Sequence, residues 1–390
     1  MKKLITCLSL SLGMALLTAG SSVLASVPLQ PVDPDTEQVT LDSLGLDEQL
    51  WGRPDQPGDR QALLTSIENS LRYLSTPSAA KAYQQYPVSG IRLDRVRRSL
   101  VRFRQLLLSS TSPAELQAAV KREFLLYKSV GRDDQGTVLF TGYFEPVYAA
   151  SRTPSAEYRY PLYRLPSNFQ GWTMPHPTRA DLEGDDGLGN NSLMGGLELV
   201  WLRDRLQAFL VHIQGSAQLQ FADGSLMTVG YAGKTNYPYT SIGRELVKDR
   251  KLPLDGLTLP VLIDYFTQFP TELDQYLPRN ESFVFFRETN GAPATGSIGV
   301  PVTAERSIAT DKSLMPPGAL ALINTSIPYP TANGQLESRL VSRYVLDQDT
   351  GSAIKGPGRV DIFMGTGSLA GDRAGVIGGT GELYYLLLKD

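Results

Sequence analysis

An aspartic acid stands alone among apolar residues near the C-terminus, in the segment "VDIFM" (360–364). Apolar surroundings disfavour the charged form of a carboxyl group and raise its pKa. Cleavage of a glycosidic bond needs such an acid, because the leaving oxygen must be protonated near neutral pH. Gly365 and Gly367 follow, and glycines let a bulky chain approach the backbone. Asp361 is therefore a candidate general acid. The alternative is that it accepts backbone hydrogen bonds at a tight turn.

Other side chains could do similar chemistry from less suitable positions. Asp349 in "DQDTGSAIKG" and Asp372 in "AGDRAG" lie among turn residues, where an aspartate commonly caps the turn. His176 lies in the proline loop "MPHPT", and His212 is predicted on a strand between apolar residues in "LVHIQGS". Either histidine could serve as a base, although a satisfied core or surface histidine is the commoner role.

Two glycine-containing segments resemble nucleotide-binding loops, and neither has the required spacing. "YAGKT" (231–235) ends like a phosphate-binding loop, but Thr228 stands where the first Gly is required and Pro238 interrupts any following helix. "GTGSLAG" (365–371) has the wrong spacing for a dinucleotide fingerprint, and too few residues follow it for a βαβ unit. We therefore expect no cofactor.

The N-terminal segment has the features of a secretory signal. Lys2 and Lys3 precede the apolar run "LITCLSLSLGMALLTA", and small residues follow in "SSVLAS", which predicts a signal peptide cut near Ala25. A membrane anchor is the alternative, but the run is short for a span of about 20 residues. Cys7 is the only cysteine and is poorly placed for lipid attachment. A mature chain without it excludes disulfides and cysteine nucleophiles.

Composition narrows the possible function classes further. The sequence contains 36 Gly, 26 Pro and 18 Tyr, which favours turns, β-structure and aromatic surfaces for a ligand. Its formal charge of −3 gives no reason to expect a nucleic-acid partner. With two histidines and no cysteine in the mature chain, a zinc site built from these residues is not expected. We predict no metal site.

The elements that must position these side chains change character along the chain. Residues 26–59 are rich in Pro and Asp and indicate a linker or loosely ordered arm. From about 60 to 130, apolar residues recur at helical spacing in "RQALLTSIENSLRYLST", "LDRVRRSLVRFRQLLLSS" and "SPAELQAAVKREFLLYKSV". The last of these opens with Ser112, Pro113 and Glu115, a helix start signal.

Short strands dominate after Gly131. "GTVLFTGYFEPVYAAS" alternates in polarity, and "AQLQFADGSLMTVGYAG" predicts a hairpin with its turn at Asp223 and Gly224. "LELVWLRDRLQAFLVHIQGS" predicts a helix that runs into a strand, and "SIGRELVKDR" and "LTLPVLIDYFTQFP" predict helices. The predicted fold class is mainly β with an N-terminal helical part, the strands forming one or two barrels.

Three blocks of sequence together resemble the membrane-bound lytic murein transglycosylase A family. They are "FTGYFEP" (140–146), "IQGSAQLQFADGSLMTVGYAGKTNYPYTSIGREL" (213–246), and a block within 293–375 that contains "SIATD" and "GRVDIF". The similarity covers nearly all of the chain from about 60 to 390. It implies a double-psi β-barrel (3D) domain formed by residues 60–150 and 283–390. An inserted second, barrel-like β domain would occupy 151–282, with a groove for a glycan strand between the two.

The resemblance also implies an activity. The family cuts the β-1,4 bond between N-acetylmuramic acid and N-acetylglucosamine without water and leaves 1,6-anhydromuramic acid. Its catalytic acid maps to Asp361, which would protonate the glycosidic oxygen and then accept the proton of the muramic C6 hydroxyl. Because the substrate supplies its own nucleophile, a second carboxylate is unnecessary. Asp349 and the backbone at Gly365 and Gly367 are candidates to support the transition state. The resemblance implies an exotransglycosylase, whereas the residues themselves do not separate exo from endo action.

Six residues of the first two blocks are predicted to bind the glycan: Thr141, Tyr143, Glu145, Gln214, Ser216 and Tyr231. Gln and Ser side chains suit acetamido and hydroxyl groups, and a Tyr ring can stack on a sugar face. Turn and core roles are the alternative for each of them.

The family resemblance also sets expectations for location and partners. Many members carry a lipidated cysteine at the mature N-terminus, and this chain has none there. We therefore expect a protein exported to the periplasm or cell envelope with at most peripheral membrane association. Its expected partner is the peptidoglycan strand, and its expected state is a monomer. The segment "GKTNYPYTSIG" is longer than the Asn-Gly version common in the family. Two other functions stay open, a non-catalytic peptidoglycan-binding protein and a hydrolytic glycosidase on the same barrel.

Overall fold

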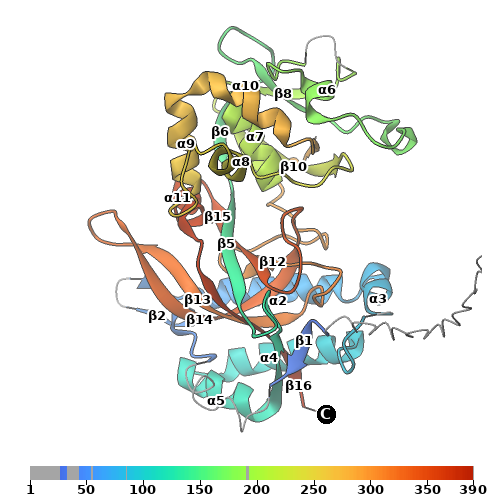
Figure 1. Ribbon diagram of the computed structural model, residues 1–390. Helices are drawn as coiled ribbons and strands as arrows, with labels where there is room; N and C mark the ends of the chain where they lie inside the picture. Colours follow the sequence, from blue (N-terminus) through green and yellow to red (C-terminus); the bar gives the residue numbers. More distant parts are fainter. Residues whose placement is uncertain (1–26, 33–43, 54–55, 85, 190–192, 390) are drawn as a thin grey trace, which may run out of the picture.

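Two β units stacked along the long axis make up the protein (Figure 1). The computed structural model describes residues 27–32, 44–53, 56–84, 86–189 and 193–389. The predicted signal peptide and Cys7 lie outside the described residues. Within these ranges, no helix is long and apolar enough to span a bilayer.

The first unit, in the lower half of Figure 1, is a closed barrel. Its eight-stranded sheet has the spatial order β1 (Leu29–Pro31), β4 (Phe124–Ser129), β16 (Thr380–Leu388), β13 (Leu320–Pro330), β14 (Leu336–Asp349), β12 (Ser307–Ala309), β15 (Arg359–Thr366) and β5 (Val138–Glu145). An additional antiparallel pairing of β16 with β5 closes the six strands from β16 to β5 into a ring. Apolar side chains that alternate along these strands, such as Leu322, Val345 and Leu386, fill its core.

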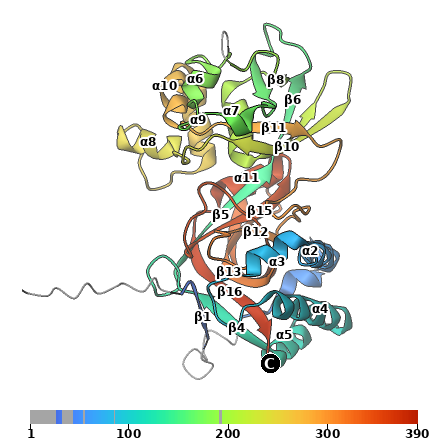
Figure 2. The same cartoon turned by 90° about the vertical axis from the view of Figure 1, so that its right-hand side faces the viewer.

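Helices cover one side of the barrel, on the right in Figure 2. They are α2 (Arg60–Tyr73), α3 (Pro77–Gln84), α4 (Leu93–Ser109) and α5 (Pro113–Glu123). The start of α5 is as predicted, because the Ser112 hydroxyl accepts the Glu115 N–H. Its end is not: the chain leaves the helix at Glu123 and continues as β4. Phe124 and Tyr127 of β4 are buried in the barrel core, and β4 pairs with β16.

The described parts of the expected linker pack against the barrel. They form β1, the 3₁₀ turn η1 (Glu48–Leu50) and a small ribbon of β2 (Gly52–Arg53) and β3 (Gln56–Pro57). Leu29, Leu44 and Leu50 are buried in the core. The fully buried guanidinium of Arg306 forms ion pairs with Asp47 and Asp59. In these described parts the loose arm expected over 26–59 is not found. The acids that suggested a solvated linker have a cationic partner about 250 residues away.

The second unit, in the upper half of Figure 1, is a six-stranded sheet with short helices. The spatial order is β11 (Val284–Glu288), β10 (Leu226–Lys234), β9 (Ser216–Gln220), β6 (Val147–Ser151), β8 (Glu198–Leu202) and β7 (Tyr160–Tyr163). A bridge between Arg164 and Phe286 links its two edges, which makes the sheet barrel-like as predicted. The predicted turn of the β9–β10 hairpin is confirmed, with Gly224 at φ +82°.

Helical segments complete the second unit. They are η2 (Phe169–Gly171), α6 (Arg179–Glu183), α7 (Arg205–Gln214), α8 (Ile242–Lys248), α9 (Leu259–Gln268), η3 (Pro270–Glu272), α10 (Leu273–Tyr276) and η4 (Leu277–Arg279). The predicted helices at α8 and α9 are present. The order expected over 197–216 is reversed, because strand β8 comes first and helix α7 follows. The Asp204 side chain accepts the Gln207 N–H at the start of α7, and Gly215, at φ +81°, ends it.

The chain crosses between the two units twice. It leaves the barrel where β5 leads through Pro146 into β6, and it returns after β11. Both β6 and β11 belong to the second sheet. The boundaries of the insert therefore fall near 146 and 289, a few residues outside the predicted 151–282. The helix α11 (Ser368–Val376) of the barrel unit packs against α9, with Gly375 close to Pro260. The predicted fold class, mainly β with N-terminal helices, is confirmed.

Candidate active site

Asp361 lies in the middle of β15, where this strand runs parallel to β5. In the register of the pair Asp361 stands opposite Thr141, and the Thr141 hydroxyl donates a hydrogen bond of 2.8 Å to Asp361 Oδ1. Side chains two positions apart on a strand share a face, so Asp361 shares its face of β15 with Arg359. The barrel therefore brings together an acid and a hydroxyl that are 220 residues apart in the chain.

A cavity of about 1420 Å³ lies between the barrel and the second unit. Its lining from the barrel includes Leu139, Tyr143, Glu145, Asp349 and Arg359, and its lining from the second unit includes Gln214, Ser216, Tyr231, Lys234 and Tyr239. Asp361 and Thr141 do not line the cavity themselves. They lie on its side of the sheet, between the lining pair Arg359–Leu139 and the lining residue Tyr143. The cavity is larger than the roughly 300–1,000 Å³ of most small-molecule sites, which suits an oligomer.

Asp361 has the protonation behaviour of a general acid. Burial raises the pKa of its carboxyl group from 3.8 to about 6, and the charge of Asp349 adds to this rise. The hydrogen bond from Thr141 and the charge of Arg359 act in the opposite direction and limit the shift. A carboxyl group of this pKa is partly protonated near neutral pH and can both donate and accept a proton. The structure thus gives Asp361 the raised pKa that its apolar flanks predicted.

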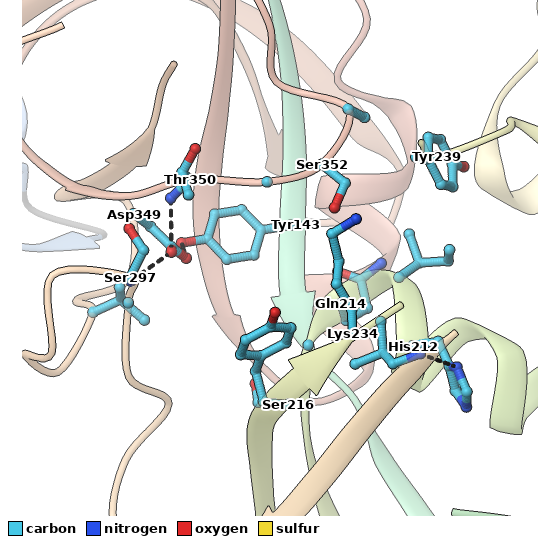
Figure 3. Close-up of a pocket in the computed structure, with 18 of the residues that line it drawn as sticks. Tyr143, His212, Gln214, Ser216, Lys234, Tyr239, Ser297, Asp349, Thr350 and Ser352 are labelled. Atoms are coloured by element: carbon cyan, nitrogen blue, oxygen red, sulfur yellow. Dashed lines mark hydrogen bonds between the residues drawn. The ribbon is translucent and has the colours of Figure 1, made fainter. Parts of the chain in front are cut away.

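Asp349, at the end of β14, has its oxygens engaged by the protein. Oδ2 accepts the Tyr143 hydroxyl at 2.8 Å, and Oδ1 accepts the backbone N–H groups of Ser297 and Thr350, each at 2.8 Å (Figure 3). Burial raises the pKa of Asp349, and these three hydrogen bonds oppose that rise. Asp349 therefore holds loops of the cavity wall together and adds negative charge near Asp361.

Glu145 lies at the end of β5 and is buried. Its Oε2 accepts the Thr366 hydroxyl at 2.9 Å and the Gln218 side-chain N–H at 3.0 Å. Burial raises the pKa of Glu145, and both hydrogen bonds oppose the rise. Because Gln218 belongs to β9 of the second unit, Glu145 connects the two units at the cavity wall.

The predicted glycan-binding residues of the second unit all line the cavity. Gln214 ends α7, and its Oε1 accepts the Phe144 N–H at 3.0 Å. Ser216 begins β9, and Tyr231 on β10 is 49% exposed. With Tyr143 and Glu145 on the opposite wall, the structure brings five of the six predicted binding residues to one cavity. Thr141 lies just behind them beside Asp361.

The two glycines that were predicted to support the transition state have a structural role. Gly365 and Gly367 have φ values of +105° and +90°, a region that disfavours other residues. They turn the end of β15 into α11, and the Gly367 N–H donates to the Glu145 carbonyl. That N–H is therefore occupied, and neither glycine lines the cavity. The rival acid Asp372 lies exposed on α11, away from the lining residues.

His212 lines the cavity, but neither histidine forms a hydrogen bond with Asp361 among the described residues. His212 lies within helix α7 and not on the predicted strand, since the helix continues to Gln214. It is buried, and its Nδ1 accepts the Val284 N–H. Burial and the nearby Arg179 hold the pKa of His212 well below 6.5. His176 is buried beside Phe169 and Trp172.

Three residues of the site are not among the predicted ones. Arg359 and Tyr239 line the cavity, and the charges of Arg359 and Asp361 both act on the Tyr239 hydroxyl. Lys312 donates hydrogen bonds to the buried Asp347 and to the Asp349 carbonyl, which anchors the end of β14. Arg359 stands two residues before Asp361, so strand alternation could have found it. Tyr239 and Lys312 have no such local signal. Among the residues that the structure describes, no cluster of three or more His, Cys, Asp or Glu side chains could hold a metal ion.

Known proteins share both the sequence blocks and this fold. Residues 139–287 match the MltA specific insert domain, and residues 306–387 match the 3D domain. The membrane-bound lytic murein transglycosylase A of Escherichia coli strain K12 is 33% identical over 258 residues, covering 66% of this chain and 67% of that protein.

Solved structures of lytic murein transglycosylases have a similar fold. The crystal structure of a membrane-bound lytic murein transglycosylase from Agrobacterium tumefaciens is similar with a TM-score of 0.68 and 26% identity, over 92% of this chain and 97% of that one. The structure of E. coli MltA with bound chitohexaose is similar with a TM-score of 0.69 over 93% of this chain and 95% of that one. At 24% identity it supports the fold alone.

The fold and the two matched domains define an enzyme of the lytic transglycosylase class. The chain belongs to the membrane-bound lytic murein transglycosylase A family.

Proposed function

We propose that the protein cleaves the β-1,4 bond between N-acetylmuramic acid and N-acetylglucosamine in peptidoglycan, without water, with Asp361 as the single acid and base. One observation carries this assignment. Asp361 has a pKa of about 6 and accepts a hydrogen bond only from Thr141 among the described residues, so its second oxygen is available to the substrate. The nearest competitor, Asp349, accepts three hydrogen bonds from the protein.

The reaction needs one carboxyl group in two roles. The protonated Asp361 gives its proton to the glycosidic oxygen as the bond from C1 to that oxygen breaks. The muramic C6 hydroxyl then attacks C1, and its proton passes to the Asp361 carboxylate, which restores the acid. The products are an N-acetylglucosamine end and a 1,6-anhydromuramic end, and no water is consumed. The attacking hydroxyl belongs to the same sugar, so its effective concentration is high without a second carboxylate to position it.

Binding of the strand follows from the two walls of the cavity. Tyr143 from the barrel and Tyr231 from the second unit offer aromatic faces to sugar rings. The side chains of Gln214 and Ser216 are within the same lining and can donate to acetamido and hydroxyl groups. We also propose that the protein is exported and acts in the cell envelope, because the N-terminal sequence has a signal-like pattern and the relatives are named membrane-bound.

Mass spectrometry of the products from purified peptidoglycan tests the proposal. We expect soluble muropeptides with anhydro ends, each lighter by one water than the hydrolytic product. We expect Asp361→Asn to lower their release by about a thousandfold or more, because the sole acid and base is lost. The matched control is Asp372→Asn on the exposed face of α11, which should keep full activity. Hydrolytic products would identify a glycosidase instead, and binding without release by the unaltered protein would identify a binding protein.

A further inference from the structure

The cavity carries a positive charge that the proposed chemistry does not use. Six basic side chains line it: Arg132, Lys234, Arg244, Arg287, Lys355 and Arg359. Within the part of the chain that the structure describes, none of the six forms an ion pair with a carboxylate. The two acids of the lining, Glu145 and Asp349, are committed to hydrogen bonds within the wall. A protein with a formal charge of −3 has therefore gathered unpaired cations in one place.

Two of these cations, one from each unit, lie close enough for their charges to act on each other. Lys234 comes from β10 of the second unit, and Lys355 comes from the barrel loop between β14 and β15. Figure 3 shows the Lys234 side chain reaching from its strand toward Ser352 of that same loop. Burial lowers the pKa of Lys234, and the charge of Lys355 lowers it further. The Lys234 ammonium group also donates to the Tyr237 carbonyl at 3.0 Å, which fixes its direction.

Arg359 and Arg244 form a second pair of cations, one from each wall of the cavity. Arg359 shares the cavity face of β15 with Asp361, and Arg244 lies on α8 of the second unit. Burial and the charge of Arg244 lower the pKa of Arg359, while the charge of Asp361 raises it. The Arg359 Nε atom is buried and has no hydrogen-bond partner among the described residues. The two guanidinium groups thus come from opposite walls, and their charges, together with that of Asp361, all act on the Tyr239 hydroxyl.

Like charges held on opposite walls repel each other in the empty cavity. An anion between them removes that repulsion and gains attraction from both sides. The substrate of the proposed reaction offers such anions, because each muramyl residue carries a carboxylate. That carboxylate is either the free lactyl group or, in peptide-bearing strands, the acids of the attached peptide. A neutral polymer of N-acetylglucosamine has none.

We propose that the Lys234–Lys355 and Arg244–Arg359 pairs form a carboxylate receptor that recognises the acid groups of muramyl residues and places the strand over Asp361. This inference rests on the proposed function. The Arg244–Arg359 pair takes the muramyl residue whose bond is cleaved, because Arg359 adjoins Asp361 on one strand face. The Lys234–Lys355 pair takes an acid group further along the strand. The receptor selects muramyl polymers over chitin-like ones and fixes which of the two alternating bonds meets the acid.

Binding measurements with three ligands test the receptor. The Asp361→Asn protein binds without turnover and is titrated with peptide-bearing strands, with peptide-free strands that have free lactyl carboxylates, and with neutral chitohexaose. We expect tighter binding of at least one anionic ligand than of chitohexaose, and a loss of that advantage at high salt. In the same background, Lys355→Gln and Arg244→Gln should each weaken anionic binding by about three- to fivefold. Chitohexaose binding should not change.

The matched control is Lys248→Gln, which removes an exposed cation from α8 outside the cavity. It should alter none of the three affinities. If Lys355→Gln weakens only the peptide-bearing strands, the receptor binds peptide carboxylates. If it weakens the peptide-free strands, the receptor binds the lactyl group. Equal losses for all three ligands, or no loss for any, would overturn the inference and leave the proposed function standing. Absence of binding to every glycan would overturn both.

Discussion

The pKa of Asp361, about 6, results from neighbours that act on it in opposite directions. Burial and Asp349 favour the neutral carboxyl group, while Thr141 and Arg359 favour the carboxylate. A group that must donate a proton and then accept one works best when neither state is strongly preferred. Thr141, opposite Asp361 on the neighbouring strand, thus lowers the pKa of the acid through its hydrogen bond.

The pH dependence of activity should report the pKa of Asp361. The reaction begins with protonated Asp361, so kcat/KM should be highest below pH 6 and should fall as the pH rises through about 6. Thr141→Val removes the hydrogen bond that stabilises the carboxylate, so the pKa rises and the falling limb moves to higher pH. Thr141→Ser keeps the hydroxyl and should keep the original profile. A limb that stays in place in Thr141→Val would show that Thr141 does not act on the acid.

The same pKa predicts a stability cost. Asp361 has a folded pKa of about 6 against 3.8 as its ordinary value, so ionisation above pH 6 favours the unfolded state. The cost is complete above about pH 6, shrinks as the pH falls toward 3.8, and vanishes below that. Asp361→Asn should therefore stabilise the protein by roughly 1–3 kcal/mol at neutral pH. Urea unfolding at neutral pH and at about pH 3.5 measures this difference. An equal effect at both pH values would contradict the prediction.

At the scale of elements, the site depends on close packing of α11 against β5. Gly142 follows Thr141 on β5, and a Cβ atom there would lie 2.7 Å from the Ala374 Cα and 3.0 Å from the Ile377 Cδ1. The Ala374 Cα is part of the helix backbone and cannot move by itself, so relief of this contact requires a shift of the whole of α11.

We expect Gly142→Ala to destabilise the protein by about 1–3 kcal/mol through overpacking. Activity should fall as well, because the shift moves Thr141 and with it the hydrogen bond to Asp361. Thermal unfolding and product release measure the two effects. Gly378→Ala is the matched control, since a Cβ at that position meets nothing within 4 Å. Unchanged stability in Gly142→Ala would mean that α11 is less firmly seated than its contacts indicate.

Local patterns predicted the elements that local interactions determine. The Ser112 cap of α5 and the Asp223–Gly224 turn are where the sequence placed them. The segment "FLLYKS" (124–129), predicted as helix, is strand β4. The prediction is wrong because an apolar run has no clear period and the strand partner β16 lies at the far end of the chain. The predicted order of helix and strand over 197–216 is wrong, although Asp204 and Gly215, which begin and end α7, are local signals in the sequence.

In the candidate site, too, only the properties that local sequence determines were predictable. The apolar flanks of Asp361 predicted its raised pKa, because burial of a strand is visible in its own sequence. The cation pairs across the cavity were not predicted, since Lys234 and Lys355 come from different units and only the folded chain makes them neighbours. The carboxylate of Asp47 was assigned to a linker for the same reason, as its partner Arg306 is 259 residues away.

At the scale of the whole molecule, the cavity exists only as long as the two units keep their relative position. Three hydrogen bonds cross between the units at one end of β5. The Gln214 side chain accepts the Phe144 N–H, the Gln218 N–H donates to the Pro146 carbonyl, and the Gln218 side chain donates to Glu145. Gln214 and Gln218 therefore have a structural role, which is to hold the two units together, in addition to any contact with the glycan.

Gln214 therefore permits a test that separates its two roles. Gln214→Leu leaves the Phe144 N–H without its acceptor, which costs about 1–3 kcal/mol. We expect the melting temperature to fall by several degrees, and kcat/KM to fall because the two walls no longer hold one geometry. Gln214→Glu keeps an acceptor oxygen and should restore the melting temperature. Ser216→Ala, on the same wall, should alter KM with little change in melting temperature. If Gln214→Leu loses activity at full thermal stability, Gln214 acts on the glycan alone and the relative position of the units does not depend on it.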